Sequence, residues 1–231
     1  MNATGVDGAK GGSRMGMSDR VGWAKALRSA AERTLGVGFA PESCRTDDWS
    51  HDELGQSRAL DRAFLRCILG PGIGEPNARD AAGRLWLLAA DRARPDLARP
   101  LISAKPGRLI SQPTEETIET ATEGELSGLH AAWRIAMRGG DAGLRERCLE
   151  AAAWSVENLQ PDNATNRPWA AHVFVELWLA RGNAGASLYA QTLVHNCQVS
   201  FGKPDRISAL VLWDGARELS PLTREGGGQT G

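Results

Sequence analysis

Two segments in the C-terminal half of the chain follow the same pattern, 42 residues apart. His130 is followed ten residues later by Gly140-Asp141, and His172 is followed ten residues later by Gly182-Asn183. In each segment a glycine suited to end a helix precedes an Asp or Asn suited to cap the next one. The pattern predicts two helix pairs that are built alike, and repeats of this length are typical of stacked helical hairpins.

The composition also favours helices. Alanine and leucine dominate the apolar residues, whereas the 231 residues contain one tyrosine and four phenylalanines. Ala, Leu and Arg are strong helix formers, and a chain poor in isoleucine and aromatic residues has little material for a central sheet. We therefore predict an all-α fold in which antiparallel helical hairpins stack as a short α-solenoid or a partial α/α toroid.

Charge and cysteine content narrow the class of protein. The formal net charge is -1, so no strong field attracts nucleic acid or an anionic membrane. The four cysteines are far apart and no signal peptide opens the chain, so we expect free thiols. No apolar run is long enough to span a bilayer. We expect a soluble, cytoplasmic protein that binds neither nucleic acid nor membrane.

Glycine-rich ends flank the predicted domain. We predict a disordered leader over 1–17 and a disordered tail over 223–231. Between them we predict a single helical-repeat domain over 18–222. A loop rich in proline and glycine divides this domain into a less regular half, 18–113, and a half with repeated hairpins, 114–222.

Caps and breakers place the helix boundaries. Ser18 is expected to cap the first helix, and Thr122 with Glu125 is expected to form a capping box. Pro168 and Pro204 are expected in the first turns of two later helices, where proline is tolerated. The predicted helices include 19–35, 56–69, 78–93, 95–103, 122–139, 168–181 and 204–219.

The helix predicted from Pro168 to Arg181 is apolar on nearly every side and should be buried. It carries His172 and Glu176, four residues apart and so on one face. Because buried ionisable groups are costly unless paired, we expect these two to contact each other or another polar group. One hypothesis makes His172 a catalytic acid–base residue tuned by Glu176, with His130 at the equivalent position of the preceding hairpin. The other is a core histidine that fixes the packing.

The same three side chains match the ligand types of a site with two histidines and one carboxylate. No H-E-x-x-H or comparable local motif is present, so helix packing alone would have to assemble such a site. We therefore predict no metal site and no cofactor.

The loop before this helix is the most distinctive polar stretch. It contains Asp162, Asn163 and Asn166, and Trp169 follows it. Asx turns and a helix cap explain these residue types structurally. The alternative is that this loop and the indole bind a polar ligand such as a sugar, because loops carry function disproportionately.

No motif indicates a particular chemistry. The chain has no G-x-S-x-G elbow and no strand leading into a phosphate-binding loop. The repeated hairpins favour a non-catalytic scaffold that binds a protein or peptide. The alternative is an α/α-toroid-type hydrolase or lyase acting on a polar substrate such as a carbohydrate, with His172 and Glu176 as the acid–base pair. A third hypothesis is a homodimer formed through an exposed hairpin edge.

Overall fold

The computed structural model confirms the all-α class. Within the residues that it describes, the chain forms nine α-helices and two short 3-10 helices, Pro41–Ser43 and Arg99–Leu101, with no β-strand. None of these helices is both long and apolar enough to cross a membrane. The predicted leader and tail lie outside the described residues, which are 19–44, 49, 58–74, 77–91, 94–110, 117–161, 167–199 and 202–220.

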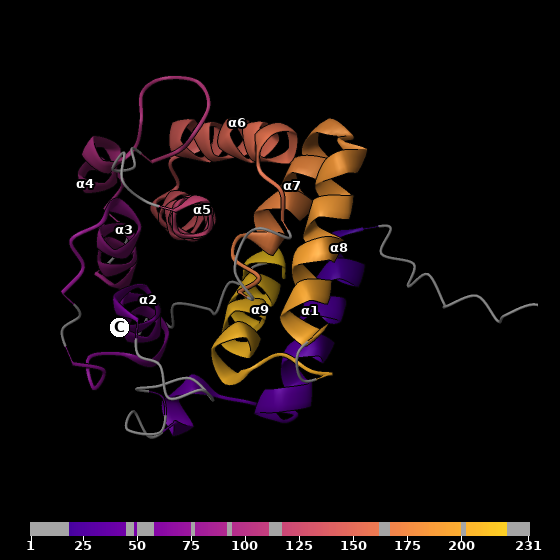
Figure 1. Cartoon of the computed structure of the whole chain (residues 1–231). Coiled ribbons are helices and arrows are strands. Elements are labelled where there is room, and N and C mark those ends of the chain that lie inside the picture. The colour runs from indigo at the N-terminus through magenta and orange to yellow at the C-terminus, as the bar shows by residue number, and fades with distance from the viewer. Residues whose placement is uncertain are drawn as a thin grey trace, which may run out of the picture.

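The nine helices are labelled in Figure 1. They are α1 (Arg20–Leu35), α2 (Ala59–Leu69), α3 (Ala81–Ala90), α4 (Pro95–Ala98), α5 (Ile118–Gly139), α6 (Ala142–Asn158), α7 (Ala171–Arg181), α8 (Ala184–Val199) and α9 (Arg206–Leu219).

Most helices pack against their neighbours in sequence. α2 packs on α3, α3 on α5, α5 on α6, α6 on α7 and α7 on α8. The main exception is α1, which lies along α9 at the right of Figure 1. α9 also contacts α2 and α7, so the last described helix joins the two sides of the molecule. The finer arrangement as a solenoid or toroid stays a prediction.

The two turns predicted from the 42-residue pattern have the same local geometry. Gly140 ends α5 and Gly182 ends α7, both in the left-handed conformation with φ of 65° and 66°. Asp141 and Asn183 then each accept the backbone N–H three residues ahead, at 2.9 and 3.1 Å. A glycine and the cap residue after it therefore mark both turns, and Arg99 also donates to Asp141 at 2.6 Å.

The predicted capping box is wrong. α5 begins at Ile118 with Thr117 as its N-cap, so Thr122 and Glu125 lie buried inside the helix. The Glu125 carboxylate accepts the backbone N–H groups of Leu109 and Ile110 instead. Its partners therefore come from the preceding loop and not from the start of its own helix.

Five other helix starts, those of α1, α2, α3, α7 and α9, shift by one to three residues from the predicted bounds. Asp19, not Ser18, caps α1 by accepting the Gly22 N–H at 2.7 Å, and Asp205 caps α9. α7 begins at Ala171, since Ala170 has a left-handed φ of 56° that helical backbone does not allow.

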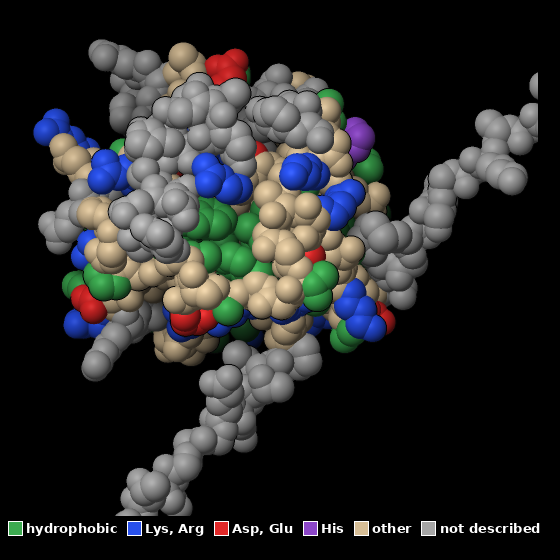
Figure 2. All heavy atoms as spheres, turned by 90° about the horizontal axis from the view of Figure 1, so that it is seen from below, with side chains coloured by type: hydrophobic (Ala, Val, Ile, Leu, Met, Phe, Trp, Pro, Cys, Tyr) green, Lys and Arg blue, Asp and Glu red, His purple; other side chains and the backbone are tan. Residues whose placement is uncertain are grey.

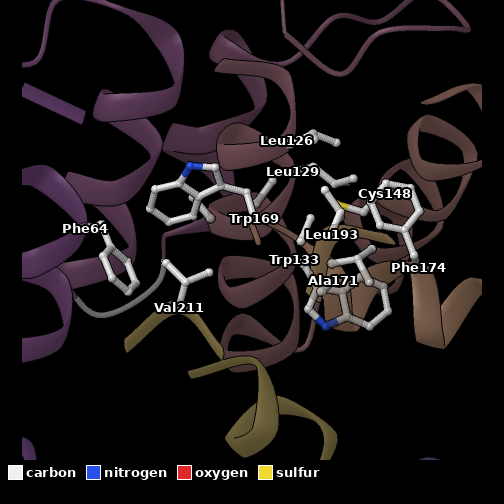
Figure 3. Packing of buried hydrophobic residues seen from close by; sticks show 14 of the residues in the cluster. Phe64, Leu126, Leu129, Trp133, Cys148, Trp169, Ala171, Phe174, Leu193 and Val211 are labelled. Carbon is white, nitrogen blue, oxygen red and sulfur yellow. The ribbon is translucent and has the colours of Figure 1, made fainter. Parts of the chain in front are cut away.

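Aromatic rings fill the space between α2, α3, α5 and α7. Phe64 contacts the rings of Trp86 and Trp169 at centroid distances of 4.9 and 5.1 Å, and Figure 3 shows Phe64 and Trp169 on neighbouring elements of this core. Trp86, Trp133 and Trp213 are also buried. Trp154 and Trp178 are only half-buried.

The surface mixes residue types. Figure 2 shows hydrophobic side chains at the centre of the face seen from below, with Lys and Arg side chains around them. Acidic side chains also appear on this face, so it does not present a field of one sign.

Candidate functional site

His130 and His172, predicted as equivalent residues of two hairpins, meet in the core. Their ring centroids are 4.2 Å apart and the ring planes are inclined by 60°. Their exposed fractions are 0% and 1%. The structure therefore brings two of the three predicted catalytic side chains together, in a fully enclosed place.

One hydrogen bond of His130 defines its tautomer. Its Nδ1 lies 3.3 Å from the backbone N–H of Ala170 and accepts it. A neutral ring then carries its proton on Nε2, which faces Oδ2 of Asp214 at 3.4 Å. Burial lowers the pKa of His130 below its ordinary value, which keeps the ring neutral near pH 7.

His172 has no such partners. Neither of its ring nitrogens forms a hydrogen bond within the described part of the chain. Burial, followed by the neighbouring His130, lowers the pKa of His172 well below its ordinary value. The ring lies against Gly215 of α9, where a Cβ atom would come within 3.2 Å of Nδ1, so glycine makes room for the imidazole.

An enclosed ion pair lies beside the two histidines. The Asp214 carboxylate accepts a hydrogen bond from the Arg134 guanidinium, which also donates to Glu218 at 3.0 Å. Burial by itself would raise the pKa of Asp214, but the charge of Arg134 outweighs it and the pKa is lowered. Asp214 is therefore a charged acceptor between Arg134 and His130.

His172 and Glu176 do not contact each other, and of the two only Glu176 has another polar group as its partner in the part of the chain that the structure describes. Glu176 pairs with Arg20 of α1 at 2.6 Å, near the surface, while His172 faces the core. Burial raises the pKa of Glu176, although Arg20 opposes this shift. Among the described residues, no three His, Cys, Asp or Glu side chains are grouped to hold a metal ion.

Only one of the four residues predicted to bind a polar ligand lies within the described part of the chain. Asp162, Asn163 and Asn166 lie outside the described residues. Trp169 is fully buried, and its indole N–H donates to Glu123 at 3.2 Å. A ring with no exposed face cannot stack on a sugar.

The buried cluster is better suited to packing than to catalysis. An acid–base residue must come within hydrogen-bond distance of the substrate proton that it moves. His130 and His172 have almost no exposed surface, so no substrate reaches them while α5, α7 and α9 stay packed. The two neutral rings and the ion pair beside them instead pack between these three helices.

A pocket between α2 and α3 holds a cysteine but not an activated one. Its volume is about 500 Å³, and Arg66, Cys67 and Asp91 are among the lining residues. Burial raises the pKa of the Cys67 thiol to about 11, although Arg134 opposes this shift. The thiol is therefore protonated near pH 7 and is a poor nucleophile.

An apolar groove lies between α1 and α8. Its volume is about 470 Å³. Arg33 is the one formally charged residue among those that line it, and the Trp23 indole N–H has no acceptor in the described part of the chain. This α1–α8 groove is lined by Trp23, Ala26, Leu27, Ser29, Ala30, Arg33, Gln191, Val194, His195 and Gln198.

The α8 wall of this groove carries an exposed stripe without formal charge. α8 contains no Asp, Glu, Lys or Arg in its 16 residues. Five of its six exposed residues recur every three or four positions, which places these five along one face. Leu188 and Val199 are 64% and 65% exposed. The α8 stripe consists of Ala184, Leu188, Gln191, His195 and Val199.

Sequence reasoning missed the α1–α8 groove. The lack of charged residues between 184 and 199 was a visible signal, because exposed helices of globular proteins normally carry a charged face. The contribution of α1 was not visible, since its distance from α8 in the sequence is large and only the tertiary fold joins them. Comparisons with protein-family models, with curated proteins and with solved structures gave no match.

Proposed function

We propose that this protein is a non-catalytic helical scaffold that binds a helical segment of another protein in the α1–α8 groove. The observation that carries the proposal is an apolar groove bordered by the uncharged α8 stripe. Depletion of charged residues distinguishes the centres of protein interfaces from the rest of the surface. Exposed apolar residues that adjoin a groove often mark a binding site.

The dimensions of the groove favour a helix as its occupant. From Trp23 to Arg33 it follows about three turns of α1, or about 15 Å. Its α1 wall presents Ala26, Ser29 and Ala30, and small side chains allow a third helix to approach the two walls closely. An amphipathic helix would place its apolar face in the groove, which is a common mode of peptide recognition.

The same proposal includes the arrangement of the hairpins as a partial toroid. Its support is that α9 contacts α1, α2 and α7, whereas the helices of an open stack contact only their neighbours. The contact between α1 and α9 also holds α1 at the edge where it meets α8 across the groove.

A displayed library of helical peptides about 16 residues long, with apolar residues at i, i+3, i+4 and i+7, tests the proposal. Selection on the whole protein should enrich binders, and Ala26→Glu should weaken their binding about tenfold or more, because it places a charge in the apolar wall. The matched control is Ala153→Glu, at a half-buried alanine of α6 that does not line the groove. Failure to enrich binders, or equal weakening by both variants, would reject the groove as the binding site.

A further inference from the structure

We propose that the helix bound in the α1–α8 groove is acidic on the flank that faces Arg33. This inference rests on the proposed function and adds the charge of the partner. It follows from the cations along the α1 wall of the groove and from the absence of acidic residues in α8.

The exposed side of α1 carries cations without acidic partners. Lys25, Arg28 and Arg33 form no salt bridge within the described residues, and Lys25, Ser29 and Arg33 follow one another at four-residue spacing. The opposite wall, α8, supplies no acid because it has none.

Arg33 is held in place by a neutral partner. Its guanidinium donates to the side-chain carbonyl oxygen of Gln198, which links the C-terminal turns of the two groove walls. A carboxylate is a stronger acceptor for guanidinium than an amide and allows two parallel hydrogen bonds. An acidic residue on the ligand would therefore take a preformed position next to Arg33 at this end of the groove.

The charges favour a different protein over a second copy of this chain. A two-fold pairing through the groove would bring the cationic side of α1 next to the same side of its copy, and like charges at an interface are repulsive. An acidic partner helix complements those cations, while its apolar face covers Ala26, Ala30 and Val194.

The test uses two synthetic 16-residue helices with the same leucine stripe. One carries glutamate on its flanks and the other carries lysine. Fluorescence anisotropy with the whole protein should give at least tenfold tighter binding of the glutamate peptide at low salt, and the preference should shrink as salt is added. Arg33→Gln should weaken the glutamate peptide about threefold, and Arg33→Glu about tenfold, with a gain for the lysine peptide.

The controls separate this inference from the proposed function. Arg84→Glu changes an exposed arginine of α3 that does not line the groove and should leave both peptides unaffected, and circular dichroism of each variant checks its fold. Equal binding of both peptides, with loss of both in Ala26→Glu, would overturn the acidic preference and leave the groove proposal standing. Binding of neither peptide, dimerisation that Ala26→Glu abolishes, or binding of a DNA duplex that Ala26→Glu leaves intact would overturn the acidic helix as occupant.

Discussion

His130 and His172 lie in van der Waals range with centroids 4.2 Å apart, yet neither donates a hydrogen bond to the other. Both rings are enclosed, and burial lowers the pKa of each. Two neutral imidazoles thus share the core with the ion pair of Arg134 and Asp214. This arrangement makes the stability of the fold depend on pH and on a few side chains in ways that can be measured.

Acidification should destabilise the protein through both histidines. Each is neutral in the folded protein and gains a proton in the unfolded chain below its ordinary pKa of about 6.5. Stability is therefore complete above about pH 6.5 and falls as the pH drops toward the lowered folded-state pKa values. Each histidine contributes up to about 1.4 kcal/mol per pH unit to the loss of unfolding free energy. Urea unfolding between pH 7.5 and 5 measures this slope.

In part of this pH range, the protonation of buried carboxylates should increase the stability of the folded protein and so oppose the effect of the histidines. Burial raises the pKa values of Glu123, Glu125 and Glu218, so protonation of these groups favours the folded state. The wild type and His172→Leu both contain these carboxylates. Their contribution therefore cancels when the unfolding free energies of the two proteins are subtracted. The wild type should lose more stability than the variant on acidification, by up to about 1.4 kcal/mol per pH unit. Parallel pH profiles would mean that the pKa of His172 is the same in the folded and the unfolded protein.

At neutral pH, His172→Leu should keep or increase stability. The substitution removes two buried nitrogens that have no hydrogen-bond partner, and leaving such a group unsatisfied costs about 1–3 kcal/mol. We expect a gain of about 1 kcal/mol in unfolding free energy by urea titration. His172→Ala is the control for volume and should lose about 2–4 kcal/mol through the cavity that it leaves. A large loss in both variants would indicate that the imidazole nitrogens are needed.

Arg134 and Asp214 should show strong energetic coupling. Arg134→Met or Asp214→Leu alone leaves one charge buried without its main partner and should reduce stability by about 3–5 kcal/mol. The double variant should be more stable than the sum of the two losses predicts, by about 2 kcal/mol or more. Chemical denaturation of all four proteins completes this cycle. Additive losses would show that the contact contributes little.

Ala170→Gly should be nearly neutral, whereas the adjacent Ala171→Gly should not. Ala170 has a left-handed φ of 56°, which glycine adopts without strain. The relief of this strain offsets about 1 kcal/mol of the stability that is lost with the buried methyl group. Ala171 is helical and buried, so glycine there loses both methyl burial and helix propensity, about 1–2 kcal/mol in total. Thermal unfolding of the two variants compares them directly. Similar losses would show that the φ of Ala170 is not strained.

Local signals in the sequence predicted the fold class and the hairpin turns. The turns at Gly140 and Gly182 each contain a glycine followed by a polar cap residue, and this local pattern is visible in the sequence. The start of α5 could not be predicted in this way. Glu125 fits a capping box by its spacing, but its carboxylate binds two backbone N–H groups of a separate loop.

The site depended still more on distant contacts. Helical spacing placed His172 and Glu176 on one side of α7, but it could not show that Arg20 of α1 would pair with Glu176. The adjacency of His130 and His172 follows from how α5 and α7 pack, although their equivalent positions in the 42-residue pattern were visible. The α1–α8 groove likewise requires a helix from the other end of the described chain.

The packing of α1 along α9 has a consequence for synthesis on the ribosome. α1 is made first among the described helices, yet the helix that covers its apolar side is made last. Trp23 and Leu27 therefore remain without their final neighbours during most of translation, when exposed apolar surface is prone to aggregation. A nascent chain of this protein should need shielding by a chaperone until α9 has left the exit tunnel.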